Sequence, residues 1–133
     1  MTRALARARN DWEVSIADFR DAEQKLNDAG RALEACEGAL DDLAAAEWHT
    51  LTRRIYAARN MAASLHSCTS TTSTWWKNFS SMVPGLSAYH ASGIAEILTP
   101  FTVGALNTSA AIMRVIAEQV TEFLTDLNQR RAA

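Results

Sequence analysis

The sequence predicts an all-α protein built from long helices. Its 133 residues include only five glycines and two prolines. Large apolar residues recur at every seventh position over the first forty residues, and stretches of strand-like alternation are almost absent. Long periodic segments with few helix-breaking residues are typical of helical proteins. The chain has the length of one domain, and it can form a core if its helices fold back on one another.

The first segment carries a coiled-coil pattern, because two ladders of core residues run through it three positions apart. One ladder holds large side chains and the other mostly small ones. We predict a self-association seam from the large ladder and its continuation, which comprises Leu5, Trp12, Phe19, Leu26, Leu33, Leu40, Leu51 and Ile55. The small ladder consists of Ala8, Ser15, Ala22, Ala29, Cys36 and Leu43.

We predict one continuous helix over about residues 4–66, since the large ladder keeps its seven-residue phase across the Asn-Asp-Ala-Gly sequence at 27–30. The alternative is a helical hairpin that turns at Asn27–Gly30, a sequence that suits the end of a helix. From Leu40 to Leu51 the ladder steps by eleven residues. Such a step predicts a stutter that locally unwinds the supercoil.

Hydroxyl side chains fill residues 67–74, and they predict an elbow or linker because they compete for the backbone hydrogen bonds of a helix. Short helices are expected over residues 75–83 and 86–98, each followed by a proline. A long amphipathic helix follows, with apolar residues again seven apart. The chain is thereby divided into a coiled-coil helix at 1–66, the elbow, and a low-charge helical segment at 75–133.

Charge is arranged in blocks. Residues 1–9 form a basic arm with three arginines, residues 10–50 carry eleven acidic and three basic residues, and Arg53, Arg54 and Arg59 restore a basic segment. We expect the basic ends of one rod to lie on the acidic middle of another, which would fix their register.

The stretch between Lys77 and Arg114 contains one formal charge, Glu96. Because an exposed surface normally carries more charge, this stretch is expected to be buried in a bundle, to form a protein interface, or to contact a lipid surface. It contains no apolar run long enough for a bilayer span, so a transmembrane segment is not expected. The candidate residues for a partner interface are Trp75, Trp76, Phe79 and Met82.

Catalysis finds no support in the sequence. His49, His66 and His90 lie at no metal-ligand spacing, and no nucleophile elbow or glycine-rich phosphate loop occurs. Cys36 and Cys68 are far apart, which predicts reduced thiols in a cytoplasm-like compartment. A net charge of −2 gives no general attraction to nucleic acid. We therefore expect no enzyme, metal, cofactor or nucleic-acid partner.

The leading hypothesis is a non-enzymatic structural or scaffolding subunit that self-associates through coiled-coil helices. The Ala- and Arg-rich composition indicates a bacterial or phage origin, and the expected location is the cytoplasm, a phage particle or another assembly. One alternative is a small helical adaptor or inhibitor that binds a protein through Trp75–Phe79. A further alternative is a peripheral coat on a lipid or granule surface.

Overall fold

The computed structural model describes residues 3–82 and 88–132, but the side chains of residues 4, 68, 75, 77–82, 88–101 and 132 lie outside this description. The described ranges contain helices and no strand, which confirms the predicted all-α class. The elements in chain order are α1 (Arg3–Ala35), the short 3₁₀ turn η1 (Glu37–Ala39), α2 (Asp42–Met82) and α3 (Ala88–Ala132).

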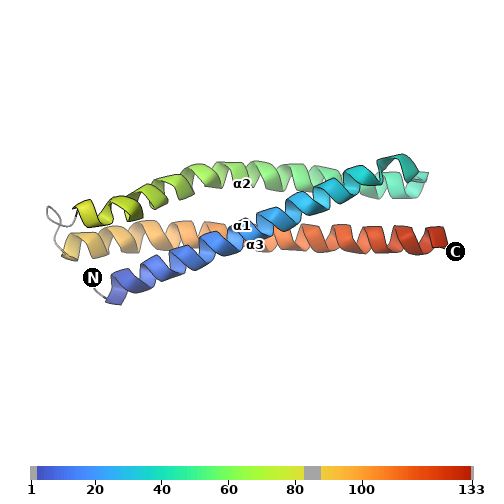
Figure 1. Ribbon diagram of the computed structural model, residues 1–133. Helices are drawn as coiled ribbons and strands as arrows, with labels where there is room; N and C mark the ends of the chain where they lie inside the picture. The colour runs from blue at the N-terminus through green and yellow to red at the C-terminus, as the bar shows by residue number, and fades with distance from the viewer. Residues whose placement is uncertain (1–2, 83–87, 133) are drawn as a thin grey trace.

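The three long helices form one elongated bundle (Figure 1). Helices α1 and α3 run in the same direction, and α2, which lies between them in the sequence, runs in the opposite direction. Helix α1 crosses α3 at a shallow angle and makes its most extensive contacts with it. With 45 residues, α3 is about 68 Å long at 1.5 Å per residue, so the bundle presents long continuous surfaces.

The large ladder fills the core of this single chain. Its members on α1 are at most 8% exposed up to Leu33, while Leu40 in the turn after η1 is half-buried. Leu51 and Ile55 are buried on α2. Helix α3 contributes its own ladder of Leu106, Met113, Val120 and Leu127. The residues of the predicted seam are thus buried against helices of the same chain, without a second copy.

Small residues lie at the contact between α1 and α3. Ala22 and Ala110 are completely buried, and Ala29 is 9% exposed. Small side chains at core positions reduce the distance between helix axes, which explains the close packing of these two helices. The last predicted member of the small ladder, Leu43, is instead 76% exposed, because it lies in the first turn of α2 beyond the chain reversal.

The prediction of one continuous helix over residues 4–66 is wrong, and so is the turn at Asn27–Gly30, because α1 continues to Ala35 and the chain reverses afterwards. Leu40 is extended, with φ −100° and ψ 134°. Asp41 then caps α2 by accepting a hydrogen bond from the backbone N–H of Ala44 at 2.8 Å. The eleven-residue step in the ladder marks this reversal.

Side chains from α2 and α3 hold the reversal in place. The indole Nε1 of Trp48 donates a buried hydrogen bond to the carbonyl of Leu33 at 2.7 Å. This carbonyl, in the last turn of α1, also accepts a hydrogen bond from the backbone N–H of Cys36 at 3.2 Å. Near the C-terminus, Arg131 donates to the carbonyl of Ala39 at 2.9 Å. The end of α3 is therefore attached to the turn between α1 and α2.

The elbow predicted at residues 67–74 is also wrong, because these residues continue α2. The hydroxyls of Thr71 and Thr74 donate to carbonyls four residues earlier in the helix. Thr72 is buried, and its hydroxyl lies 3.2 Å from that of Thr102 on α3. Burial against α3 and bonds within the helix thus outweigh the low helix propensity of this segment.

The two short helices expected at 75–83 and 86–98 do not form separate elements. Helix α2 runs unbroken to Met82, and α3 begins at Ala88 and passes through Pro100. A proline inside a helix removes one backbone hydrogen bond, and here the helix continues despite that loss.

We expect Trp48→Phe to destabilise the bundle. The variant removes one donor from the carbonyl of Leu33, which still accepts from the backbone N–H of Cys36. Loss of the indole hydrogen bond costs about 1 kcal/mol, and the smaller ring also reduces the buried volume. Urea unfolding followed by circular dichroism measures the loss. Tyr56→Phe is the control, since Tyr56 is 68% exposed on the same helix. Equal stability of the two variants would show that the indole bond does not secure the turn.

Candidate protein-interaction surface

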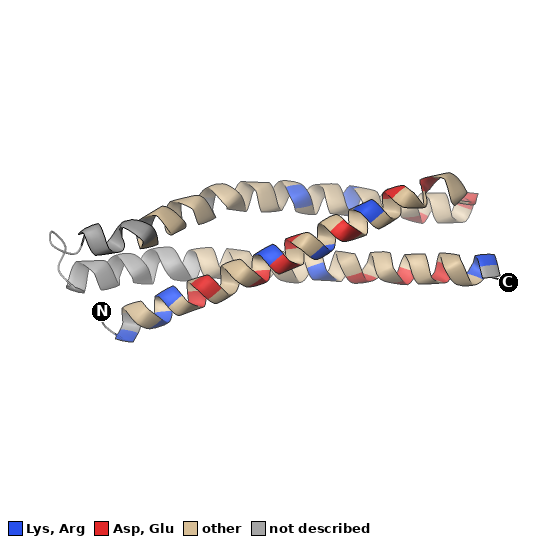
Figure 2. Cartoon of the chain, in the orientation of Figure 1, with Lys and Arg blue, Asp and Glu red and all other residues tan. Residues whose placement is uncertain are grey.

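Charge is distributed unevenly over the three helices (Figure 2). Helix α1 carries charged residues along its whole length. Helix α2 has no Asp, Glu, Lys or Arg between Arg59 and Lys77, and α3 has none between Glu96 and Arg114. These two uncharged segments lie side by side, so one long face of the bundle lacks charge over half its length.

A groove of about 650 Å³ runs between α2 and α3 on this face. We call it the α2–α3 groove. A methyl group added at Gly104 would meet no atom within 4 Å, so the groove is open at this position. Its lining contains no charged side chain and consists of Met61, Ser64, Leu65, Gly104, Ala105, Thr108 and Ser109.

Ser109 lines the groove with a hydroxyl that has no hydrogen-bond partner among the described residues. Its side chain is 1% exposed. Leaving a buried hydroxyl unpaired costs about 1–3 kcal/mol, so such groups are uncommon in folded proteins.

Apolar side chains extend this face beyond the groove. Ile112 and Val115 are 42% and 52% exposed. They lie four and seven residues after Thr108, on the same stripe of α3. Exposed apolar side chains beside an uncharged groove are typical of protein-interaction sites. We define the α2–α3 surface as Met61, Gly104, Thr108, Ile112 and Val115.

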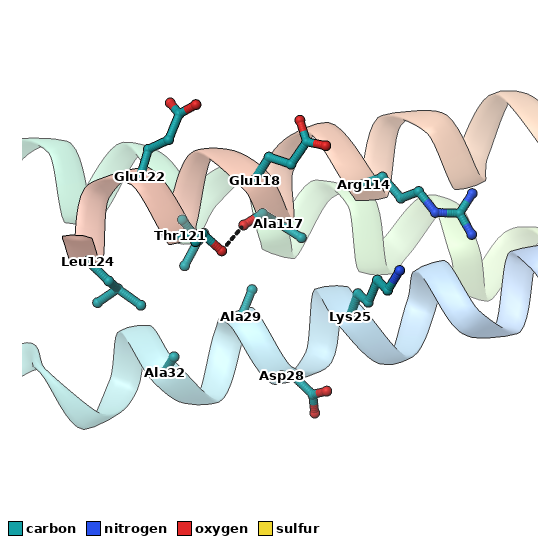
Figure 3. Close-up of a pocket in the computed structure, with 11 residues that line it drawn as sticks. Lys25, Asp28, Ala29, Ala32, Arg114, Ala117, Glu118, Thr121, Glu122 and Leu124 are labelled. Atoms are coloured by element: carbon teal, nitrogen blue, oxygen red, sulfur yellow. Dashed lines mark hydrogen bonds between the residues drawn. The ribbon is translucent and has the colours of Figure 1, made fainter. Parts of the chain in front are cut away.

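A second groove, of about 640 Å³, lies between α1 and α3 (Figure 3). Ala29 and Ala117 face one another across it, while Glu118 and Glu122 point away from α1. Lys25 and Asp28 of α1 and Arg114 of α3 also line it, so this groove is rimmed by charge. It differs in this respect from the α2–α3 groove.

Arg114 joins α1 to α3 near the middle of the bundle. Its guanidinium donates to the carboxylate of Asp18 at 2.6 Å and to that of Asp21 at 3.2 Å. These hydrogen bonds lower the pKa of both carboxyl groups and raise the pKa of Arg114. The cluster is a contact between helices, since each charge is paired within the chain.

Polar contacts also connect α1 with α2. His66 lies 2.9 Å from the carboxylate of Glu23, and Arg59 donates to the side-chain oxygen of Asn27 at 3.2 Å. The guanidinium of Arg59 passes over Gly30, where an added methyl group would lie 2.5 Å from Nη2. These charged and polar groups therefore contribute to the packing of α1 against α2.

Of the four residues that the sequence proposed for a partner interface, the structure describes the side chain of Trp76 alone. Trp76 is 5% exposed and belongs to the core. The side chains of Trp75, Phe79 and Met82 lie outside the described residues. The exposed residues Ile112 and Val115 were not predicted individually, although they belong to or directly follow the low-charge stretch that the sequence analysis identified.

The described part of the chain offers neither a cluster of metal ligands nor a membrane span. Within it, no group of three or more His, Cys, Asp or Glu side chains is placed to hold a metal ion. None of the described helices combines the length and the apolar character that a membrane span requires.

No protein-family model, curated protein or solved structure matches this chain. Function is therefore inferred from the surfaces of the bundle.

We expect the Arg114 cluster to make stability depend on pH in the acidic range. A carboxyl group whose pKa is lowered by folding stabilises the folded state above its ordinary pKa, near 3.9, and this contribution is lost as the pH falls. The free energy of unfolding should therefore fall less between about pH 6 and about pH 3 in Arg114→Met than in the wild type. Urea titrations at both pH values measure the difference.

Asp11→Asn is the matched control, because Asp11 is an exposed carboxyl group on the same helix as Asp18 and Asp21. This variant should keep the wild-type pH dependence. An unchanged dependence in Arg114→Met would contradict a stabilising role of the cluster.

Proposed function

We propose that this protein is a non-enzymatic structural subunit that self-associates through its α2–α3 surface. One observation carries the proposal: Ile112 and Val115 are exposed beside an open groove whose lining contains no charged side chain. The proposed contact is therefore the outer face of α2 and α3. The seam that was proposed from the sequence fills the core instead.

The shape of the bundle supports a scaffolding role. Its helices of 33, 41 and 45 residues give a stiff, elongated unit that can present the same surface over a long distance. Burying the exposed parts of Ile112, Val115 and Met61 in a protein contact would contribute favourable free energy in proportion to the apolar area removed from water.

The alternative of an adaptor that binds through Trp75–Phe79 gains no support from the described side chains. Trp76 is buried between the helices, so its ring is not presented to a partner. The α2–α3 surface is therefore the better candidate for assembly.

We expect the wild-type chain to form dimers or larger species, and Ile112→Arg/Val115→Arg to be monomeric. Two arginines in the apolar contact would have to lose water without a partner charge, and this cost opposes association. Light scattering coupled to size-exclusion chromatography measures the mass against the 14.6 kDa of one chain.

Val14→Arg is the matched control, because Val14 is 60% exposed on α1, away from the proposed surface. It should leave the mass unchanged. Circular dichroism must show that all three proteins keep their helix content. A wild-type chain that remains monomeric at high concentration would overturn the proposed function.

A further inference from the structure

Charged side chains from both helices lie at one end of the same face. Arg53 and Arg54 are exposed on α2, and Glu118 and Glu122 are exposed on α3. They lie at the same height along the bundle, since Arg54 donates to the side chain of Gln119 at 2.8 Å. Arg54 and Glu122 also line one groove of about 500 Å³. At Arg54 and Glu122, next to the apolar α2–α3 surface, α2 is thus basic where α3 is acidic, while farther from that surface Glu47 of α2 and Asp126 of α3 line the groove.

The geometry points to a second copy of this chain as the occupant of the α2–α3 groove, related to the first by a two-fold axis parallel to the helices. This inference rests on the proposed function and adds the arrangement of the copies. In it, α2 of each copy lies on α3 of the other. The four helices at the contact then have antiparallel neighbours throughout, as in four-helix bundles.

Charge complementarity selects this arrangement. Rotation about an axis parallel to the helices keeps every residue at its own height. The basic pair Arg53 and Arg54 of one copy therefore meets Glu118 and Glu122 of the other, and the same contact occurs twice. In the antiparallel arrangement, the charged end of each copy lies against the uncharged half of the other. That arrangement provides no opposite charge for the two arginines.

The groove itself suits a contact with α2 of a second copy. Its α3 side is formed by small residues, including Gly104 and Ala105, which permit close approach of another helix.

Two charge-reversed variants test the pairing. We expect Arg53→Glu/Arg54→Glu and Glu118→Arg/Glu122→Arg each to weaken self-association by about tenfold or more at low ionic strength, because like charges then face one another. An equimolar mixture should restore association, since acidic and basic pairs again meet across both contacts. Sedimentation velocity measures the species formed, and circular dichroism checks that each variant remains helical.

The control is Arg3→Glu/Arg7→Glu, which changes the net charge by the same amount as the first variant but on exposed positions of α1. It should neither weaken association nor restore it in a mixture with Glu118→Arg/Glu122→Arg. Restoration by this control would overturn the specific pairing in favour of a general effect of net charge.

A distance measurement tests the direction of the copies independently. A spin label at Leu43→Cys, in a Cys36→Ser/Cys68→Ser background, marks the start of α2. In the parallel two-fold arrangement the two labels lie about 30 Å apart or less, a distance set by the packing of neighbouring helices. In the antiparallel arrangement they lie about 54 Å apart, because Leu43 is about 27 Å along the helix from Met61 in the groove.

The outcomes separate this inference from the proposed function. A monomeric wild-type chain overturns both. A chain that self-associates with a label distance near 54 Å, or whose charge variants fail to restore one another, supports the proposed function and overturns the parallel arrangement. Restored association together with the short distance supports the parallel arrangement.

Discussion

An apolar stripe that follows a long helix must be covered along its entire length, and this constraint determines the architecture. The stripe of α1 extends from Leu5 to Leu33. One chain covers it only by reversing direction twice and supplying two further helices of similar length. The chain reversal after α1, the Trp48 bond to Leu33 and the contact of Arg131 with Ala39 all follow from this requirement, since they fix where the first two helices meet.

Covering the stripe internally changes which surface remains for other molecules. A seam used between chains would place Trp12 and Phe19 at an intermolecular contact, whereas here both are core residues. The charged groups of α1 are then partly engaged with its neighbours, as Arg114 is with Asp18 and His66 with Glu23. The face of α2 and α3 that points away from α1 is left with few charges, and its apolar residues have no cover within the described chain.

The fold class and the core of α1 could be predicted from the sequence because a seven-residue period specifies both a helix and its buried side. The chain reversal was missed because Leu40 keeps the seven-residue phase of Leu33 although α1 ends at Ala35 between them. Asp41, which caps α2, was the available signal. The hydroxyl segment was missed because contacts with Thr102 on another helix decide its structure.

For the candidate site, the sequence indicated an uncharged region, but not which of its side chains are exposed. A heptad gives the buried side of a helix, whereas the surface left between two helices depends on their relative direction and height. Ile112 follows the stripe of Gly104 and Thr108. This stripe becomes one wall of a groove only when α2 is placed beside it. The exposed surface is therefore a property of the packed bundle and could not be read from one helix.

The core beneath this surface differs from the core near the C-terminus. Thr69, Thr72, Thr102 and Ser109 are buried at the uncharged half, whereas Val120, Phe123 and Leu127 fill the other half. Burial of hydroxyl groups contributes less stabilisation than burial of apolar side chains. Under the proposed function, a partner that binds only the folded chain would stabilise it, so folding and assembly would be coupled in this half of the molecule.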